Sequence, residues 1–263
     1  MESVLRVSHL KAGYGKHVVL NDVSFEVAPR EIRIILGTSG CGKSTLLNNI
    51  LGLERSFSGT IAFWDKELRA GIDLVPDSVR TRMGVLFQGG ALLSSLSVFD
   101  NVALPLKLHC PGLSDDVVRE MVADALEKVH LLHAFHRLPS ELSGGMRKRA
   151  ALARAIVLEP ELLFCDEPSA GLDPVTSRSL DDLLLELRDV LGVSIVIVTH
   201  ELASIKAIGD RVLFLHKGDV LLDGTLDEGL SSQVPEIKDF FARVSRAAAA
   251  GATCYRFNFE EDR

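Results

Sequence analysis

The sequence predicts an α/β fold with a mostly parallel sheet as its core, an antiparallel β portion and a helical insert. Short apolar runs of strand length alternate with segments whose apolar residues recur at helical spacing. Three of these runs are followed by residues that could bind a ligand or take part in catalysis. Residues 32–36 precede a glycine-rich loop, residues 161–165 precede two carboxylates, and residues 194–199 precede a histidine. Strands alternating with helices are typical of a sheet with helices on its faces.

The composition excludes several classes of protein. The 263 residues carry 29 basic and 36 acidic side chains, a net charge of −7, so the chain lacks the basic character of a nucleic-acid-binding protein. No apolar run approaches the roughly 18–20 residues of a membrane span. The four cysteines lie far apart, which fits free thiols in a reducing compartment. We therefore expect a cytoplasmic protein with no nucleic-acid partner.

The first 90 residues predict the β portion and the start of the core. Residues 4–10 and 18–27 alternate apolar and polar side chains, and residues 61–64 form a further strand. Tyr14 falls in the turn between the first two strands, where it is either an ordinary turn aromatic or a ring offered to a ligand. Residues 65–81 are charged and turn-rich, and a strand over 82–87 ends at Gln88.

A phosphate-binding loop follows the strand at 32–36. The loop matches G-x-x-x-x-G-K-[ST], and apolar residues at helical spacing follow it. Strand, glycine loop and helix together aim backbone N–H groups and a helix N-terminus at one anion, which disfavours a chance glycine-rich turn. Lys43 would reach the β- and γ-phosphates of a nucleotide, and the Ser44 hydroxyl would bind Mg²⁺. The loop consists of Gly37, Thr38, Ser39, Gly40, Cys41, Gly42, Lys43, Ser44 and Thr45.

Residues 91–158 predict the helical insert. The segment 98–106 predicts a short helix that Pro105 breaks. Ser143 is the expected N-cap of a strong helix that continues to residue 158, and Gly144 and Gly145 occupy its first turn. Glycine is unfavourable inside a helix, but at a helix start it allows close approach to an anion.

Two carboxylates and a histidine end the next core strands. Asp166 and Glu167 follow the run at 162–165, where a buried carboxylate is costly unless it binds something. We expect Asp166 to hold Mg²⁺ through water and Glu167 to polarise an attacking water, the alternative being a pair that only caps the next turn. His200 ends the strand at 194–199, at the sheet edge where α/β proteins bind ligands.

The remaining segments complete the predicted domains. A loop at 169–174 leads to a helix at 180–190, and a short helix at 203–208 precedes a hairpin formed by 211–216 and 219–222. We expect an ATP-binding core over residues 1–90 and 159–225, a helical subdomain over 91–158, and a C-terminal extension over 226–263. Within that extension, Ile237, Phe240, Phe241 and Val244 predict one face of a satellite helix.

This combination of motifs resembles the nucleotide-binding subunit of the ABC (ATP-binding cassette) family. The match spans about residues 4–225, and its motifs occur in the family's order. They are Tyr14, residues 37–45, Gln88, residues 142–145, residues 162–167, residues 169–173 and His200.

The resemblance implies a role for each matching residue. Tyr14 would stack on the adenine of ATP, and Gln88 would contact Mg²⁺ and the attacking water. Glu167 would be the general base, and His200 would contact the γ-phosphate. Asp173 would cross the interface of a cassette dimer.

The residues support such a homodimer independently. The phosphate loop and the segment Ser143-Gly144-Gly145 are two anion-binding helix starts, and the helical insert should hold them apart. A twofold axis would bring the second of these onto ATP held by the partner's loop. Hydrolysis would then release the pair.

Met146 stands where the family usually has glutamine. Together with the sequence around Gln88, it resembles a narrower branch, the cassettes of phospholipid-trafficking systems that maintain outer-membrane lipid asymmetry. The branch implies integral membrane permeases, a lipid-binding partner and a peripheral position on the inner face of the inner membrane.

The alternatives are an importer of another substrate and a non-transport ATPase that regulates a membrane complex, as in cell division. A soluble ABC ATPase acting on nucleic acid would usually carry two cassettes or a long coiled-coil insert, and a dead scaffold would lack Lys43, Asp166, Glu167 or His200.

Overall fold

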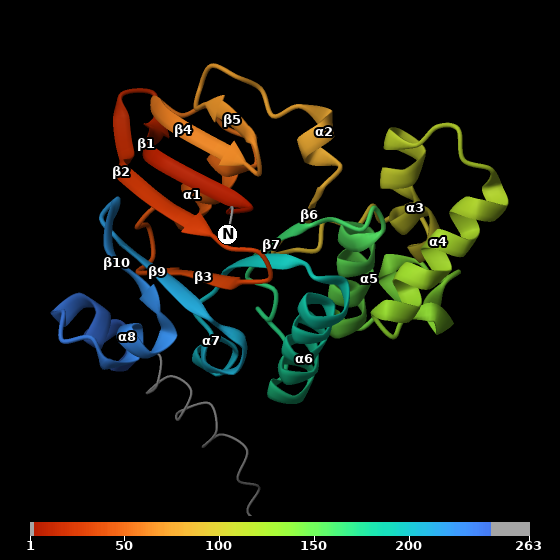
Figure 1. Ribbon diagram of the computed structural model, residues 1–263. Coiled ribbons are helices and arrows are strands. Elements are labelled where there is room, and N and C mark those ends of the chain that lie inside the picture. The colour runs from red at the N-terminus through yellow and green to blue at the C-terminus, as the bar shows by residue number, and fades with distance from the viewer. Residues whose placement is uncertain (1–2, 243–263) are drawn as a thin grey trace, which may run out of the picture.

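The computed structural model describes residues 3–242 and shows two β-sheets, with helices packed on both faces of the larger sheet (Figure 1). The larger sheet has the strand order β10-β9-β3-β8-β7-β6. Its strands from β9 to β6 are parallel, and β10 forms an antiparallel hairpin with β9. The bounds are β3 (Ile32–Gly37), β6 (Met83–Leu86), β7 (Leu162–Asp166), β8 (Ser194–Val198), β9 (Arg211–His216) and β10 (Asp219–Thr225).

The smaller sheet is antiparallel and has the order β2-β1-β4-β5. Its first strand alternates buried and exposed residues, as expected for a sheet with one face packed on a core. Tyr14, expected in a turn, is the last residue of that strand. The bounds are β1 (Leu5–Tyr14), β2 (His17–Val27), β4 (Ser58–Phe63) and β5 (Lys66–Arg69).

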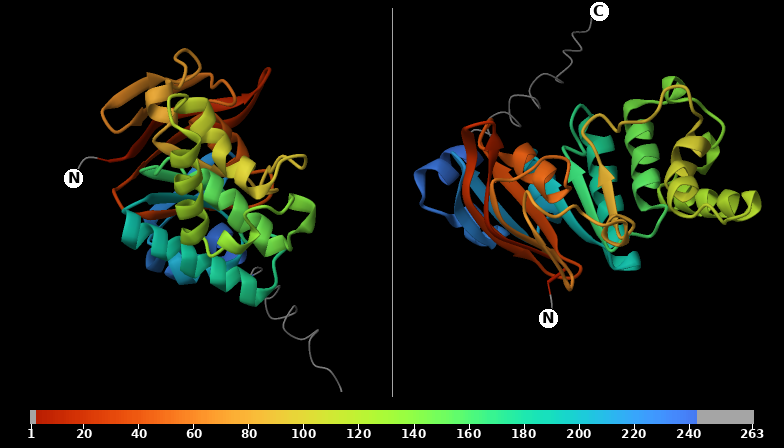
Figure 2. Two further views of the ribbon diagram at one scale, coloured as in Figure 1. Left: turned by 90° about the vertical axis from the view of Figure 1, so that its right-hand side faces the viewer. Right: turned by 90° about the horizontal axis from the view of Figure 1, so that it is seen from above.

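Five of the helices form two groups beside the larger sheet. Figure 1 shows α6 and α7 below this sheet, with α3, α4 and α5 gathered at one end of the molecule, and Figure 2 shows the same separation from above. Within residues 3–242, none of the helices has the length and apolar character needed to cross a membrane. The bounds are α1 (Lys43–Ile50), α2 (Asp77–Arg80), α3 (Val98–His109), α4 (Asp115–Lys128), α5 (Gly144–Ile156), α6 (Pro174–Leu191), α7 (Leu202–Ile208) and α8 (Leu226–Ser231).

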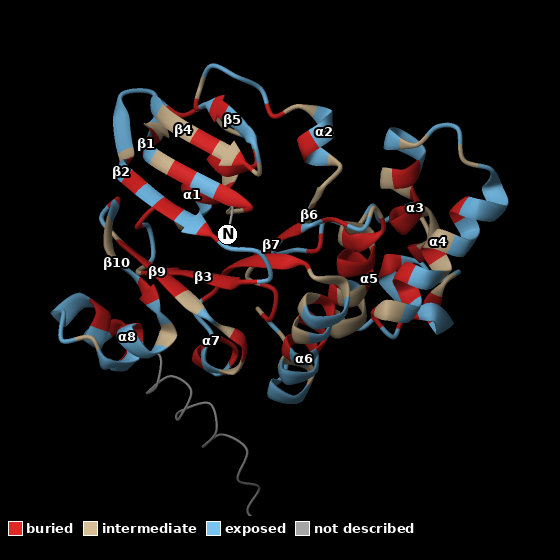
Figure 3. Ribbon diagram, viewed as in Figure 1, coloured by how far each residue is buried: buried red, intermediate tan, exposed pale blue. Residues whose placement is uncertain are grey.

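The larger sheet separates two hydrophobic cores. Ile32, Ile34 and Leu36 pack into one core with the helices, whereas Ile35 faces α1 and the smaller sheet. Side chains alternate across a strand, so this division follows directly from the sequence of β3. Figure 3 shows the parallel strands of the larger sheet as mostly buried, whereas the edge strand β10 is mostly half-buried or exposed. A parallel sheet covered on both faces in this way holds the ends of its strands in fixed positions.

Pro105 does not break its helix, contrary to the sequence-based prediction. Helix α3 continues past it to His109. A proline inside a helix removes one backbone hydrogen bond. Here Val102 and Leu106 are fully buried on the same helix, and their packing offsets that loss.

Three other expectations needed correction. The turn-rich segment 65–81 contains β5 and α2. Helix α6 begins at Pro174, six residues before the expected start, because the Asp173 side chain caps it. The predicted satellite helix covers residues 235–242 and packs directly into the main core through Ile237, Phe240 and Phe241. Val244 and the rest of the predicted extension, residues 243–263, lie outside the described residues.

Candidate functional site

The phosphate loop connects β3 to α1, as the motif predicts. Gly37 approaches the neighbouring strand so closely that an added Cβ would lie 2.3 Å from the carbonyl oxygen of Leu215. Gly42 is the N-cap of α1 and has a φ of 110°, which side-chain-bearing residues rarely adopt. The glycines thus let the loop curl at the helix N-terminus, where unpaired N–H groups attract an anion.

Lys43 extends across the mouth of this loop. Its ammonium group donates hydrogen bonds to the carbonyl oxygens of Gly37 (2.9 Å) and Thr38 (3.2 Å). Cys41 lies beneath the loop and is only 3% exposed, and this burial raises the pKa of its thiol. The loop therefore presents a fixed positive charge toward solvent and keeps its thiol inside.

Tyr14 stands beside the loop. The residue is 53% exposed, and its hydroxyl lies 3.3 Å from the Thr45 hydroxyl. A hollow of about 270 Å³ separates the ring from the loop, and it is lined by Tyr14, Val19, Gly40, Gly42, Lys43, Ser44 and Thr45. An exposed aromatic face next to a phosphate-binding loop suits a nucleotide, because the base can stack while the phosphates bind the N–H groups.

Glu167 and His200 meet at the carboxyl edge of the larger sheet. The Glu167 carboxylate oxygen Oε1 accepts a hydrogen bond from Nδ1 of His200 at 2.7 Å, although 33 residues separate them. The two residues follow β7 and β8, which are parallel neighbours, so their side chains emerge at the same edge. The other carboxylate oxygen of Glu167 is buried and has no hydrogen-bond partner among the described residues. An unsatisfied buried oxygen of this kind calls for an explanation and points to a ligand.

The backbone of Glu167 is also unusual. Its φ is 46°, a left-handed conformation that is strained for a residue with a side chain. A hydrogen bond from its N–H to the carbonyl of Val198 (2.8 Å) helps to hold it. Such strain is concentrated at functional sites, where the surrounding structure maintains it.

Asp166 precedes Glu167 as the last residue of β7 and lies near the phosphate loop. Burial raises the pKa of its carboxyl group, and the neighbouring charge of Glu167 raises it further. The ammonium groups of Lys148 and Lys43 act in the opposite direction. The fold therefore brings the loop lysine and the carboxylates of β7 into one electrostatic site.

Gln88 lies beside these carboxylates. Strand β6 pairs with β7 in a register that places Leu86 opposite Cys165, so two residues further on Gln88 comes level with Glu167. Its side chain is exposed, and its backbone carbonyl accepts a hydrogen bond from Lys148. Lys148 was not predicted from the sequence. Its burial could have been inferred from its position four residues before Leu152 and eight before Ile156, which places it on the buried stripe of α5.

Ser143, Gly144 and Gly145 begin α5, as predicted. The Ser143 hydroxyl accepts a hydrogen bond from the Met146 N–H at 3.3 Å, and the glycines form the first turn. Figure 1 shows α5 with the helices at one end of the molecule, whereas α1 lies with the smaller sheet. A single chain therefore does not join this helix start to its own phosphate loop.

Asp173 caps the next helix rather than joining the carboxylates. Its side chain accepts hydrogen bonds from the N–H groups of Val175 and Thr176, both at 3.0 Å. A hydrogen bond from the Thr176 hydroxyl, together with these N–H bonds, lowers the pKa of Asp173. The loop from Ser169 to Asp173 connects the segment around Glu167 to α6.

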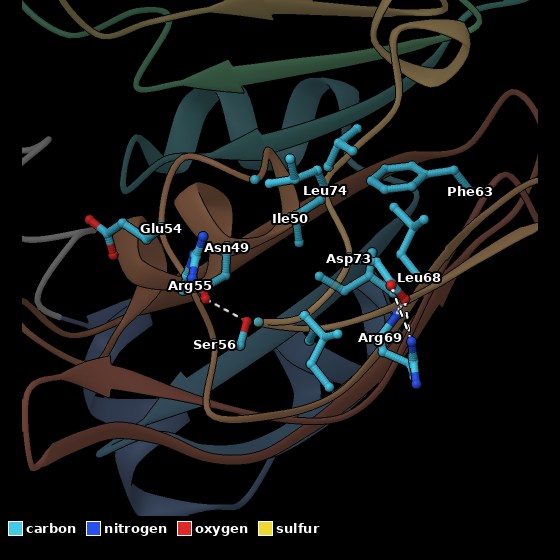
Figure 4. A pocket seen from close by; sticks show the side chains of 16 residues that line it. Asn49, Ile50, Glu54, Arg55, Ser56, Phe63, Leu68, Arg69, Asp73 and Leu74 are labelled. Carbon is cyan, nitrogen blue, oxygen red and sulfur yellow. Dashed lines mark hydrogen bonds and ion pairs between the residues drawn. The ribbon is translucent and has the colours of Figure 1, made fainter.

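A separate pocket lies at the far end of α1 from the phosphate loop. Figure 4 shows its lining, with Asn49 and Ile50 from the end of that helix and Leu68 and Arg69 from β5. Several of its polar groups are already paired, since Ser56 donates to Asn49 at 2.6 Å and Arg69 contacts Asp73. This pocket is therefore no part of the site.

Comparisons with known proteins agree with this geometry. The family model for the ABC transporter matches residues 20–170. The methionine import ATP-binding protein MetN of Clostridioides difficile is 40% identical over 86% of this chain and 70% of its own length. The intermembrane phospholipid transport system ATP-binding protein MlaF of Haemophilus influenzae is 36% identical over 91% of this chain and 90% of its own.

A solved structure extends the agreement to three dimensions. It is a dimeric ATP-binding cassette, MJ0796, in a post-hydrolysis state bound to ADP and Pi. It superposes with a TM-score of 0.75 at 28% identity, and the match covers 84% of this chain and 98% of that one. The chain described here therefore belongs to the ABC transporter family, as the ATP-hydrolysing cassette of a transporter.

Proposed function

We propose that Glu167 is the general base for ATP hydrolysis and that His200 orients it. The observation that carries this proposal is the 2.7 Å contact between the Glu167 carboxylate and His200 Nδ1. Asp166 precedes Glu167 in the chain, and the positive charge of Lys43 acts on the Asp166 carboxyl group. The contact fixes one carboxylate oxygen and leaves the other, which has no partner among the described residues, as an unused proton acceptor. The exposed ring edge of His200 then remains available to the γ-phosphate.

The nucleotide would lie across the loop and Tyr14. The adenine stacks on the exposed Tyr14 ring, and the phosphates follow the N–H groups of residues 37–45 to Lys43. The hollow between the ring and the loop supports this placement.

Mg²⁺ fits the adjoining carboxylates. The unpartnered oxygen of Glu167 and the raised pKa of Asp166 both indicate negative charge that the described chain only partly compensates. Ser44, Gln88 and Asp166 offer the oxygen ligands that this ion prefers. When bound, Mg²⁺ neutralises charge on the β- and γ-phosphates.

The complete site would require a second copy of this chain. Ser143, Gly144 and Gly145 start a helix of 13 residues, α5, which lies with the helices at one end of the molecule, whereas the loop leads into α1 beside the smaller sheet. In a twofold dimer they would bind the γ-phosphate held by the partner, and Asp173 would lie at the interface. The dimeric ADP-bound cassette described above supports this arrangement.

A groove beside Gln88 would receive the permease. The groove has a volume of about 410 Å³ and lies between β6, α3 and α5, where Phe87, Leu104 and Leu108 line it. Leu108 is 67% exposed. An exposed apolar groove one residue from Gln88 lets a membrane partner act directly on the hydrolytic site. The chain would then sit on the cytoplasmic face of the inner membrane.

Phospholipid is the transported substrate we favour. MlaF of H. influenzae matches nearly the whole of this chain, and Met146 departs from the family's usual glutamine. Met146 packs partly buried against the main core, so its side chain contributes to packing rather than to nucleotide binding. The similarity to MetN makes methionine-type import the second candidate.

The test is affinity purification of the tagged chain from membranes, followed by mass spectrometry of proteins and lipids. We expect a small permease, a lipid-binding protein and bound phospholipid. Leu108→Arg is the matched variant: it should lose the permease and retain ATP hydrolysis. A substrate-binding protein for an amino acid, or a cell-division protein without lipid, would refute phospholipid transport and leave the ATPase assignment intact.

A further inference from the structure

Lys148 is a buried lysine next to the site, and the roles assigned so far do not use it. It lies in the second turn of α5 and is only 7% exposed. A lysine is almost never buried unless its charge is paired or hydrogen-bonded. Burial lowers its pKa, and the nearby Cys165, Asp166 and Glu167 oppose that shift.

The ammonium group binds main-chain atoms rather than carboxylates. It donates one hydrogen bond to the carbonyl oxygen of Gln88 and a second, of 3.1 Å, to the carbonyl oxygen of Glu167. The two carbonyls belong to residues that follow the neighbouring parallel strands β6 and β7. Lys148 therefore ties together the ends of two strands and the helix α5.

The hydrogen bond from Lys148 to the Glu167 carbonyl involves the residue with the strained backbone described above. The Glu167 carbonyl accepts a second hydrogen bond, from the N–H of Ala170 at 3.2 Å. Without these donors, the left-handed backbone at Glu167 could relax and turn its carboxylate away from His200. The buried ammonium group thus helps to maintain the conformation that aims the base.

We propose that Lys148 is a positioning residue for hydrolysis, which holds Gln88 and Glu167 in one fixed arrangement relative to α5. This inference rests on the roles proposed above for those two residues. Because α5 also begins with Ser143, one rigid helix connects the segment proposed to bind the partner's ATP to the base of its own chain. A small displacement of the base is enough to slow a reaction strongly.

Lys148→Met tests the inference, because methionine keeps an unbranched apolar stem but has no donor. We expect kcat for ATP to fall about 10- to 100-fold while KM and the affinity for a fluorescent ATP analogue change less than about 2-fold. Hydrogen–deuterium exchange should rise at residues 87–91 and 167–170 and stay unchanged in β3 and β8. Lys148→Gln keeps N–H donors one bond short of the original position and should recover part of kcat.

Arg149→Met is the matched control. Arg149 is the next cation on α5 and also donates to a carbonyl oxygen, that of Val129 at 2.8 Å, and to the Ser179 hydroxyl of α6 at 2.8 Å, but to neither Gln88 nor Glu167. Its loss should leave kcat unchanged within about 2-fold, because a helix cation that does not bond to Glu167 cannot aim the base.

Three outcomes would overturn the inference. These are an unchanged kcat in Lys148→Met, an increase in exchange spread over the whole chain, or an equal loss of kcat in Arg149→Met. If Lys148→Met does not fold, Lys148→Leu, which also lacks a donor, decides, and its full activity with unaltered exchange would count against the proposal. Glu167→Gln belongs in the same series. Full activity of Glu167→Gln would refute the site assignment itself, whereas its loss beside an active Lys148→Met refutes only the role of Lys148.

Discussion

Replacing Glu167 with glutamine separates its chemical role from its structural one. Glutamine has the same shape, and its amide oxygen can still accept the hydrogen bond from His200 that now measures 2.7 Å. The amide nitrogen would occupy the place of the carboxylate oxygen that has no partner among the described residues. The substitution therefore removes a proton acceptor and a buried charge with little change in contacts.

The two consequences have different magnitudes. Loss of a general base lowers a rate by about 10²- to 10⁴-fold, which corresponds to about 3 to 5 kcal/mol in the activation free energy. The free energy of unfolding should change by no more than about 1 kcal/mol, since the hydrogen bond to His200 persists. The repulsion that now raises the pKa of Asp166 should also disappear, which lowers that pKa.

Phosphate release at saturating ATP and Mg²⁺ measures the first effect, and thermal unfolding measures the second. Size-exclusion chromatography with ATP should show a dimer that persists, because the nucleotide proposed to join two chains is no longer hydrolysed. Glu161→Gln is the matched control. Glu161 precedes the same strand β7 at its other end and pairs with Arg82 at 2.7 Å on the surface, so its variant should hydrolyse ATP at the parental rate.

One result would refute the reasoning directly. If Glu167→Gln releases phosphate at the parental rate and is fully folded, Glu167 is not the base. A rate loss accompanied by a large fall in unfolding temperature would instead show that the carboxylate is needed for folding, contrary to the geometry described here.

Three further predictions concern buried groups. Asn101 is fully buried and bonds both backbone groups of Leu93, so Asn101→Leu should lower the free energy of unfolding by about 2 to 4 kcal/mol in urea titrations; unchanged stability would contradict this. Burial raises the pKa of Asp181 from 3.8 to about 6, so its contribution to stability is complete below about pH 4 and disappears as the pH rises through 6. The stability advantage of Asp181→Asn over the parent should therefore grow between pH 4 and 7, by at most about 3 kcal/mol, and a pH-independent difference would contradict the raised pKa. Cys41 should react slowly with a bulky thiol reagent, because it is buried and its pKa is raised. Bound ATP should slow the reaction further, and modified protein that still binds ATP would refute the placement of the loop.

The sequence alone predicted the parts of the site that depend on local conformation. The phosphate loop needs glycines at fixed positions between a strand and a helix, and the cap at Ser143 needs a hydroxyl directly before a helix. These requirements act over a few residues and are therefore visible in the chain itself. The strands of the larger sheet were predictable for the same reason, because their apolar runs are short and bounded by turn residues.

Tertiary packing decided the rest. The buried face of α3 lets the helix pass Pro105, and the main core captures the helix at 235–242. The contact between Glu167 and His200 depends on β7 and β8 being neighbours, and the bonds of Lys148 depend on where α5 lies across the sheet. Such contacts join residues far apart in the chain, so no local pattern specifies them. The sequence determined which chemical groups are available, and only the fold determined which of them meet.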